Sequence, residues 1–147
     1  MNYVSVIRDR LNSQTLGTPL SWAAENGHPE VVKLLMSRED VELDASDFRA
    51  RTPLFFTILN GDEGVVRLIL SRYELNSNSL ENSWGTPLSV VITRGQVGMV
   101  SLLMGWKDII LNRLSTVGYS AIYLATWGGQ EEILGILLAR EDADPNL

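Results

Sequence analysis

A repeat of 34 residues constrains the fold of this chain more than any other feature. The triplet Thr-Pro-Leu occurs three times at this spacing, with a looser fourth copy, and the copies begin at Thr18, Thr52, Thr86 and Ser120. Two further landmarks keep the same step: a glycine at Gly27, Gly61, Gly95 and Gly129, and a small polar residue at Asp44, Asn78, Asn112 and Asn146. A period of this length over most of 147 residues predicts a solenoid, in which neighbouring copies of one small unit complete each other's core.

Each copy indicates two short helices followed by a polar linker. A threonine or serine can cap the first helix with its side-chain oxygen, and proline fits the first helical position. The first copy predicts a helix over roughly 19–26 that stops at Gly27, where a left-handed backbone favours glycine, and a second helix over about 29–37. The second helices are apolar at almost every position, as in "VVKLLM" (Val31 to Met36), so neighbouring units must cover them. The linker over 38–51 is too polar for a core helix and predicts an extended arm with a turn at its tip.

Composition excludes several classes of function. A net charge of −6 opposes attraction to phosphate backbones and anionic lipids, so we expect neither nucleic acid nor membrane as a partner. No apolar run approaches the roughly 18 residues of a membrane span. The absence of cysteine agrees with an intracellular protein, either cytoplasmic or nuclear.

Residues suited to catalysis are scarce. His28 is the only histidine and there is no cysteine, so we interpret His28 as a packing or hydrogen-bonding residue at the start of a second helix. The chain lacks the phosphate-binding pattern G-x-x-x-x-G-K-[ST], and its paired carboxylates lack the spaced oxygen ligands of a cation loop. We therefore predict that the chain is not an enzyme and has no cofactor or metal.

The stretch "TPLSWAAENGHPEVVKLLM" (Thr18 to Met36) resembles an ankyrin repeat in its T-P-L opening, alanine pair, glycine-histidine break and V-V-x-L-L second helix. The sequence "TPLSWAAENGH", together with the "LLxRxD" endings, is particularly similar to long ankyrin arrays of fungal proteins. Such arrays are often attached to NTPase modules of the immune-receptor type. The resemblance implies an all-α fold, an ankyrin-repeat solenoid of stacked helix-turn-helix units with projecting β-hairpin arms. It also implies a concave surface that binds other proteins.

On this basis we expect a single array over residues 1–147. It would hold a partial N-terminal unit at 1–14 and repeats at 15–48, 49–82, 83–116 and 117–147. The last second helix, in "EEILGILLAR" (Glu131 to Arg140), is as apolar as the internal copies, whereas terminal units of stable arrays usually have a polar outer face. We therefore expect a segment of a longer array, in which uncapped terminal repeats could associate end to end.

One departure from the family pattern concerns the arm tips. The family places glycine at the turn, and Gly118 fits, but Leu16, Ala50 and Trp84 occupy the corresponding positions. A residue with a side chain is costly at positive φ. We therefore expect the second tip to be irregular or of another turn type, and Gly85 to take over the role of the turn glycine in the third.

Positions that vary between units while the framework repeats are candidate binding residues. They are Phe48, Arg49 and Arg51 at the second tip, Arg94 and Trp127 on first helices, and Tyr119 at the fourth tip. Aromatic and arginine side chains are enriched among binding hot spots, and the arginines would suit an acidic partner segment. The alternative is that the aromatic side chains tuck against the adjacent arm, which we favour for Trp84.

Two classes of function follow. The first is a non-catalytic protein-protein interaction module that binds another protein or peptide through the concave face of arm tips and first helices. The second is a structural spacer or self-association segment of a larger multidomain protein, with no partner at that face.

Overall fold

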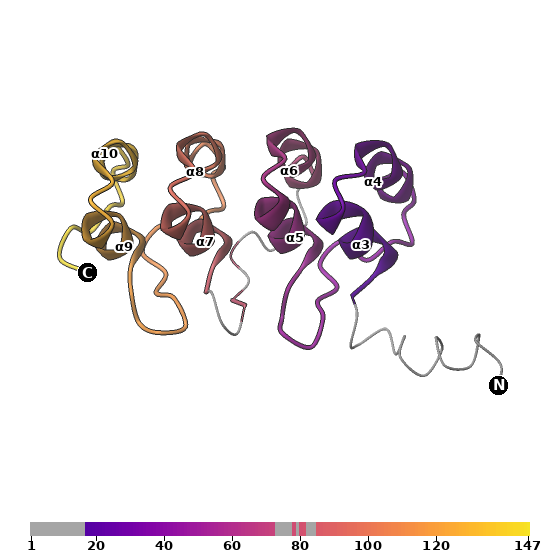
Figure 1. The fold of residues 1–147 in the computed structure, drawn as a ribbon, viewed down its shortest axis with the longest axis horizontal. Helices are drawn as coiled ribbons and strands as arrows, with labels where there is room; N and C mark the ends of the chain where they lie inside the picture. Colours follow the sequence, from indigo (N-terminus) through magenta and orange to yellow (C-terminus); the bar gives the residue numbers. More distant parts are fainter. Residues whose placement is uncertain (1–16, 73–77, 79, 82–84) are drawn as a thin grey trace.

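The computed structural model describes residues 17–72, 78, 80–81 and 85–147, and these residues form helices joined by turns and linkers. The helices are α3 (Pro19–Glu25), α4 (Pro29–Met36), α5 (Pro53–Asn60), α6 (Glu63–Leu70), α7 (Pro87–Thr93), α8 (Val97–Met104), α9 (Ala121–Trp127) and α10 (Glu131–Leu138). They stand in a row of pairs, with α3, α5, α7 and α9 in one layer and their partners in the other (Figure 1). We number the units one to four by these pairs. The arm that leads into a unit takes the number of that unit, whereas the first residues after a second helix are counted with that helix. The predicted all-helical solenoid is confirmed.

The ends of the helices form as the sequence predicts. Each first helix is capped by the threonine or serine before it, whose side-chain oxygen accepts a backbone N–H three residues later at 3.0 to 3.3 Å. The four break glycines all adopt the left-handed conformation, with φ between 63° and 80°. No helix of the described residues is long and apolar enough to cross a membrane.

The core lies between the two layers and between successive units. Each first helix packs against its own partner helix and against the first helix of the next unit, and the second helices pack in the same order. Buried apolar side chains form one continuous cluster from Leu20 in the first unit to Leu137 in the fourth. Side chains such as Ile58 and Ile92 are fully buried, so the units depend on each other for apolar burial.

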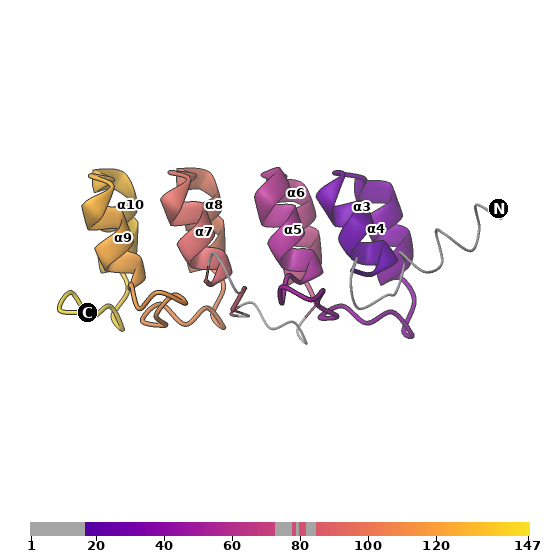
Figure 2. The same cartoon turned by 60° about the horizontal axis from the view of Figure 1, so that its bottom comes forward.

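The linkers over 38–51 and 106–119 project from the layer of first helices, at one end of the helix pairs (Figures 1 and 2). In the second arm Asp47 N–H donates to Arg51 O at 3.1 Å and Ala50 N–H donates to Asp47 O at 2.9 Å. The fourth arm repeats this pattern with Ser115, Gly118 and Tyr119. Within the described residues the arms close through such short pairs and form no continuous strand, the one bridge joining Glu81 to Gly85.

The prediction of an irregular or different turn at the second tip is wrong. Ala50 has φ 63°, in the same left-handed region as Gly118 at 83°. The physical reason is the carboxylate of Asp47, which accepts the backbone N–H groups of Arg49 at 2.9 Å and Arg51 at 3.0 Å and so holds the turn around Ala50. Gly85 adopts φ 86°, as required of a substitute glycine. Leu16 and Trp84 lie outside the described residues.

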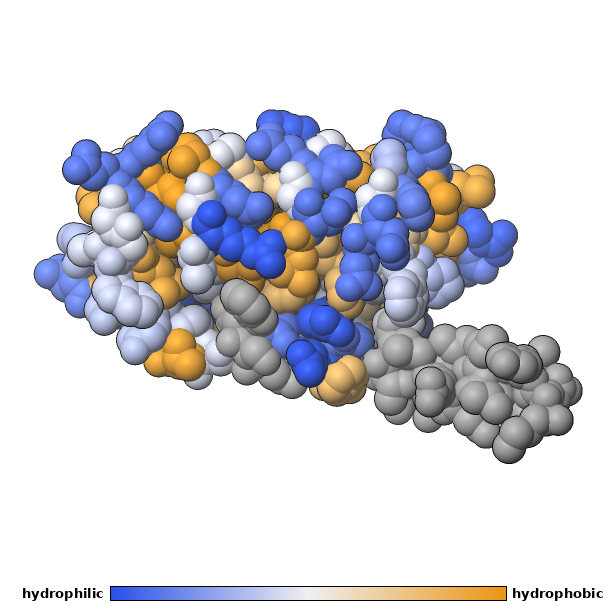
Figure 3. Space-filling model, viewed as in Figure 1, coloured by the Kyte–Doolittle hydropathy of each residue, from blue (hydrophilic) through white to orange (hydrophobic). Residues whose placement is uncertain are grey.

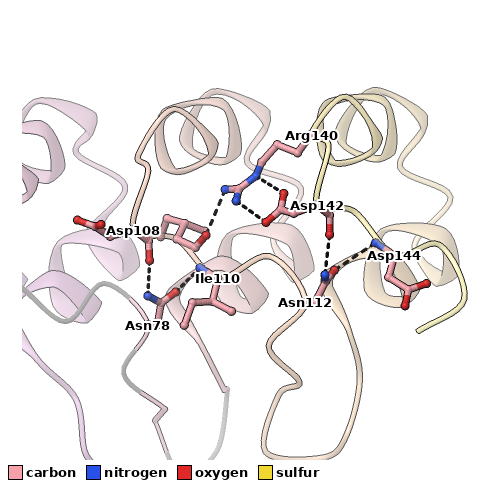
Figure 4. A network of polar contacts seen from close by, with 8 residues as sticks. Asn78, Asp108, Ile110, Asn112, Arg140, Asp142 and Asp144 are labelled. Atoms are coloured by element: carbon pink, nitrogen blue, oxygen red, sulfur yellow. Dashed lines mark hydrogen bonds and ion pairs between the residues drawn. The ribbon is translucent and has the colours of Figure 1, made fainter.

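The recurring asparagine joins each linker to the next one (Figure 4). The Nδ2 of Asn78 donates to Asp108 O at 2.6 Å, and its Oδ1 accepts the N–H of Ile110 at 2.7 Å. Asn112 makes the equivalent two bonds one unit later, to Asp142 O at 2.6 Å and from Asp144 N–H at 3.3 Å. These side-chain amides satisfy backbone groups that have no helix or sheet partner.

Other side chains reach back to the preceding unit. Arg72 donates to Met36 O at 2.7 Å and Arg140 donates to Ile109 O at 3.1 Å. Gln130 donates to Ile92 O at 2.7 Å, at the end of a first helix. Each joint, by which we mean the contact between consecutive units, is therefore an apolar interface with polar bonds to backbone carbonyls at its edge.

Candidate binding surface

Three of the predicted site residues lie on the second arm, but they differ in how they are held. Phe48 is exposed, and the Arg49 guanidinium lies 5.4 Å from the centre of its ring. Arg51 is half-buried, pairs with the Asp47 carboxylate at 2.6 Å, and lies 4.7 Å from the centre of the Phe56 ring. Arg51 is thus largely committed to the fold, whereas Phe48 and Arg49 face solvent.

The carboxylate of Asp47 is the electrostatic centre of this arm. Burial by itself would raise its pKa, but hydrogen bonds from the Arg51 side chain and from the N–H groups of Arg51 and Arg49 outweigh that effect and lower the pKa of Asp47 below its ordinary value. The side chain is buried and stays ionised at neutral pH. Asp47 therefore stabilises the arm and holds Arg51 in place.

Arg94 lies in the third unit, at the end of α7. Its guanidinium is exposed and donates to Leu59 O at 2.8 Å, so the same side chain joins the second and third units and faces solvent. It stands between the second arm and the fourth unit along the chain.

Tyr119 and Trp127 come together in the fourth unit. Their ring centres are 6.5 Å apart at 50°, and Trp127 is 77% exposed. Tyr123 lies on the first turn of α9 and stacks on Tyr119 at 4.7 Å and 16°. We call Tyr119, Tyr123 and Trp127 the aromatic cluster. Sequence reasoning missed Tyr123, although it lies four residues before Trp127, which places the two side chains on one side of the same helix.

The surroundings of the aromatic cluster are uncharged. A shallow depression of about 260 Å³ beside Trp127 is lined by Thr93, Leu124, Gly128 and Gln130. The sequence from Leu114 to Gln130 has no charged residue, although charged residues make up 20% of the chain. This surface therefore suits an apolar or aromatic group better than an ion.

The predicted residues form two separate groups. Phe48, Arg49 and Arg51 share the second arm, Tyr119 and Trp127 share the fourth unit, and Arg94 lies in the unit between them. A partner that touches all six must therefore extend across three units.

Groups suited to catalysis or metal binding are not brought together in the part of the chain that the structure describes. His28 is exposed at the start of α4, and its side chain makes no capping hydrogen bond. Across the described ranges no cluster of three or more His, Asp or Glu side chains is placed to hold a metal ion.

Comparison with known proteins agrees with the fold. A family model described as ankyrin repeats in three copies matches residues 6–81, just over half of the chain. No curated protein matches the chain at a significant level. Domains of the matched family are typically protein-protein interaction modules and are generally not catalytic. The repeat, the capped helix pairs and the family match lead to one conclusion: this chain belongs to the ankyrin repeat family.

Proposed function

We propose that the chain binds another protein through the arm tips and first helices, with Phe48, Arg49, Arg51, Arg94, Tyr119 and Trp127 in contact. The observation that carries this proposal is Trp127. Of its equivalents in the other units, Glu25 and Thr93 are exposed and Leu59 is half-buried, so stacking of a further unit would cover this position at most in part. A tryptophan held in solvent beside a second aromatic ring is a favourable anchor for a partner, because burying it removes a large apolar area from water.

The exposed arginines and the aromatic cluster each favour a particular kind of residue in the partner. Arg49 and Arg94 are exposed and offer planar donor groups to carboxylates, which favours an acidic or mixed-charge segment. The uncharged aromatic cluster favours an apolar or aromatic side chain in the same segment. Arg51 contributes less than the sequence predicts, because its guanidinium already pairs with Asp47.

Selection of peptides from a random display library on the immobilised 147-residue chain tests this proposal. Binding of the tightest peptide is then measured by titration calorimetry. Replacing Tyr119→Ala together with Trp127→Ala should weaken binding by about 2 kcal/mol, roughly 30-fold, as for hot-spot residues. Circular dichroism checks that the double variant is folded.

The matched control is Lys33→Ala with Arg67→Ala, two exposed residues on second helices. Their loss should leave binding within about a factor of two, because exposed ion pairs contribute little. If the control pair abolished binding and the aromatic pair did not, the partner would lie on the second helices and the proposed surface would be wrong. Selection of no peptide would favour the spacer class of function.

A further inference from the structure

One position at the end of each first helix determines how the joint with the preceding unit is covered. In the second unit this residue is Asn60, whose Nδ2 lies 2.6 Å from the point where a Cβ on Gly27 would stand. In the third unit it is Arg94, which donates to Leu59 O at 2.8 Å. In the fourth unit it is Gly128, so no side chain from this position covers the joint between the third and fourth units.

The depression beside Trp127 lies at this uncovered joint. It is lined by Thr93 of α7, by Leu124 and Trp127 of α9, and by Gly128 and Gln130 in the turn that follows. Its volume of about 260 Å³ suits one large side chain and is too small for a helix or strand. The helices α7 and α9 pack side by side in the row (Figure 1), so the depression belongs to an internal joint.

The missing side chain also leaves a backbone acceptor without a donor. Thr93 O is the equivalent of Leu59 O, which accepts an N–H of the Arg94 guanidinium. Among the residues that the structure describes, no N–H group donates to Thr93 O. An occupant made only of hydrocarbon would take this carbonyl out of water and give it no hydrogen bond in return, which is unfavourable. The occupant should therefore carry a hydrogen-bond donor.

The charges around the depression favour a neutral donor over a cationic one. Arg94 directly follows Thr93 and is exposed, so an ammonium or guanidinium group placed there would meet a like charge. The sequence from Leu114 to Gln130 holds no carboxylate that could compensate. Over α9, at the left of Figure 3, the surface has mostly pale colours of intermediate hydropathy, and the deepest blue lies farther right. An aromatic ring with a neutral donor fits, because the ring can also pack against Trp127.

We infer that the depression between α7 and α9 receives a tryptophan or tyrosine side chain of the partner, whose N–H or O–H donates to Thr93 O. This inference rests on the proposed function and assigns the anchor residue of the bound segment. A carboxylate next to the anchor in that segment meets Arg94. Phenylalanine or leucine fills the same space but leaves Thr93 O without a donor, so the depression selects for the donor as well as for the ring.

Titration of the 147-residue chain with N-acetyltryptophanamide, followed by two-dimensional amide NMR, tests the inference without a selected peptide. The largest shifts should fall on the backbone N–H groups of Gly128 and Gln130, with a Kd of about 1–10 mM, as expected for one side chain. The matched probe is the same compound methylated on the indole nitrogen, which keeps the ring and loses the donor. It should bind about fivefold more weakly, the effect of one neutral hydrogen bond.

Three outcomes of this titration would overturn the inference. They are the absence of a saturable shift, equal binding of the two probes, and shifts confined to residues outside the depression.

A variant that fills the depression gives a second test. Gly128→Arg places at this joint the side chain that Arg94 provides one joint earlier. Gly128 has φ −77°, which any residue adopts, and an added Cβ would press only on the flexible side chain of Gln130, at 3.1 Å. The arginine should occupy the depression and donate to Thr93 O itself, so N-acetyltryptophanamide should bind about tenfold more weakly. Unchanged binding to the folded variant would contradict the inference.

The matched control is Gly135→Arg. Gly135 is exposed on α10, in the other layer, and an added Cβ would meet no atom within 4 Å. This change adds the same charge and bulk to the chain and should leave binding of the probe unchanged. Gly128→Asn, which introduces the residue of the first two units, should act in the same direction as Gly128→Arg and serves if arginine disturbs the fold.

The selected peptide separates this inference from the proposed function. Methylation of the indole nitrogen of its tryptophan should weaken binding about fivefold, and Gly128→Arg about tenfold. If Tyr119→Ala with Trp127→Ala abolishes binding while these two changes have no effect, the proposed surface stands and the anchor is wrong. If no peptide is selected but N-acetyltryptophanamide binds at Gly128 more tightly than its methylated analogue, the anchor site stands and the proposed function fails.

Discussion

The second and fourth units follow one sequence pattern, yet the same positions are buried in one and exposed in the other. Leu70, which lies beside residues of α8, and Phe55 are buried, whereas Leu138 and Tyr123 face solvent. The residue types are alike, so the neighbour and not the local sequence decides which side chains leave water. Hydrophobic stabilisation in this chain is therefore a property of its joints.

The arms of these two units reach the same turn by different means. In the fourth arm glycine accepts the left-handed backbone at position 118, and the hydroxyl of Ser115 accepts the N–H of Tyr119 at 3.1 Å. In the second arm Ala50 takes that conformation, and the Asp47 carboxylate accepts two backbone N–H groups and pairs with Arg51. One turn depends on backbone freedom, the other on a buried charge.

The largest expected effect comes from matched leucines. Leu70→Ala should lower the free energy of unfolding by about 2–5 kcal/mol, the range for a buried leucine that leaves a cavity. Leu138→Ala should cost less than about 1 kcal/mol, because surface changes away from special features have small effects. Urea unfolding of the two variants measures both costs. Equal costs would show that stacking on the next unit does not determine burial.

An intermediate effect is expected for the buried charge of the second arm. Asp47→Asn removes the ion pair with half-buried Arg51 and should cost about 1–3 kcal/mol at neutral pH. The matched change Ser115→Ala should cost about 1 kcal/mol or less, since it removes one neutral hydrogen bond. A larger cost for Ser115→Ala would contradict the distinction between the two arms.

The pH dependence of this effect follows from the lowered pKa of Asp47. The folded state binds the carboxyl proton more weakly than the unfolded state, whose pKa is about 3.9. Asp47 therefore contributes its full stabilisation above that pH and loses it as the pH falls through the lower folded value. Arg38 and Arg140 also lower the pKa values of Asp40 and Asp142 by hydrogen bonding to their carboxylates. The difference between the unchanged chain and Asp47→Asn, which should shrink in acid, isolates Asp47.

The smallest effect concerns the turn residue itself. Gly118→Ala should lower the free energy of unfolding by about 1 kcal/mol. The whole cost should come from the positive φ, because an added Cβ would meet no atom within 4 Å. Ala50→Gly should stabilise the chain by less than about 1 kcal/mol, since relief of strain is partly offset by the greater freedom of glycine when unfolded. Thermal unfolding of the two variants measures both changes in stability. Destabilisation by Ala50→Gly would show that Asp47 removes the strain at Ala50.

Helix caps and helix stops could be predicted from neighbouring residues in the sequence, but the turn at Ala50 and the burial of Asp47 could not. The cap at Thr52 and the stop at Gly61 depend on neighbours within a few residues, so they could be predicted from the sequence. The turn at Ala50 depends on a carboxylate three residues earlier that offsets the steric cost of positive φ, which propensity alone does not predict. Arg51 was assigned to partner binding because the burial of Asp47 is not visible in the sequence. The six-residue site stays a prediction.

Tyr123 shows a second limit of sequence reasoning. Its equivalents Ser21, Phe55 and Ser89 are all buried, so the repeat pattern predicts an interior side chain at this position. Only its place in the last helix pair leaves it exposed. A residue-by-residue comparison of units can identify the core, but the ends of the row must be considered separately.

At two joints, a backbone N–H donates to an asparagine side chain of the preceding linker, so its hydrogen exchange depends on that joint. The N–H of Ile110 donates to Asn78 in the preceding linker, and that of Asp144 donates to Asn112, so neither bond survives when the two linkers part. Deuterium exchange at these two backbone sites therefore follows the separation of neighbouring linkers, even while the helices on either side stay intact. After correction for local sequence, the ratio of the two exchange rates shows which of two successive joints opens more often under native conditions.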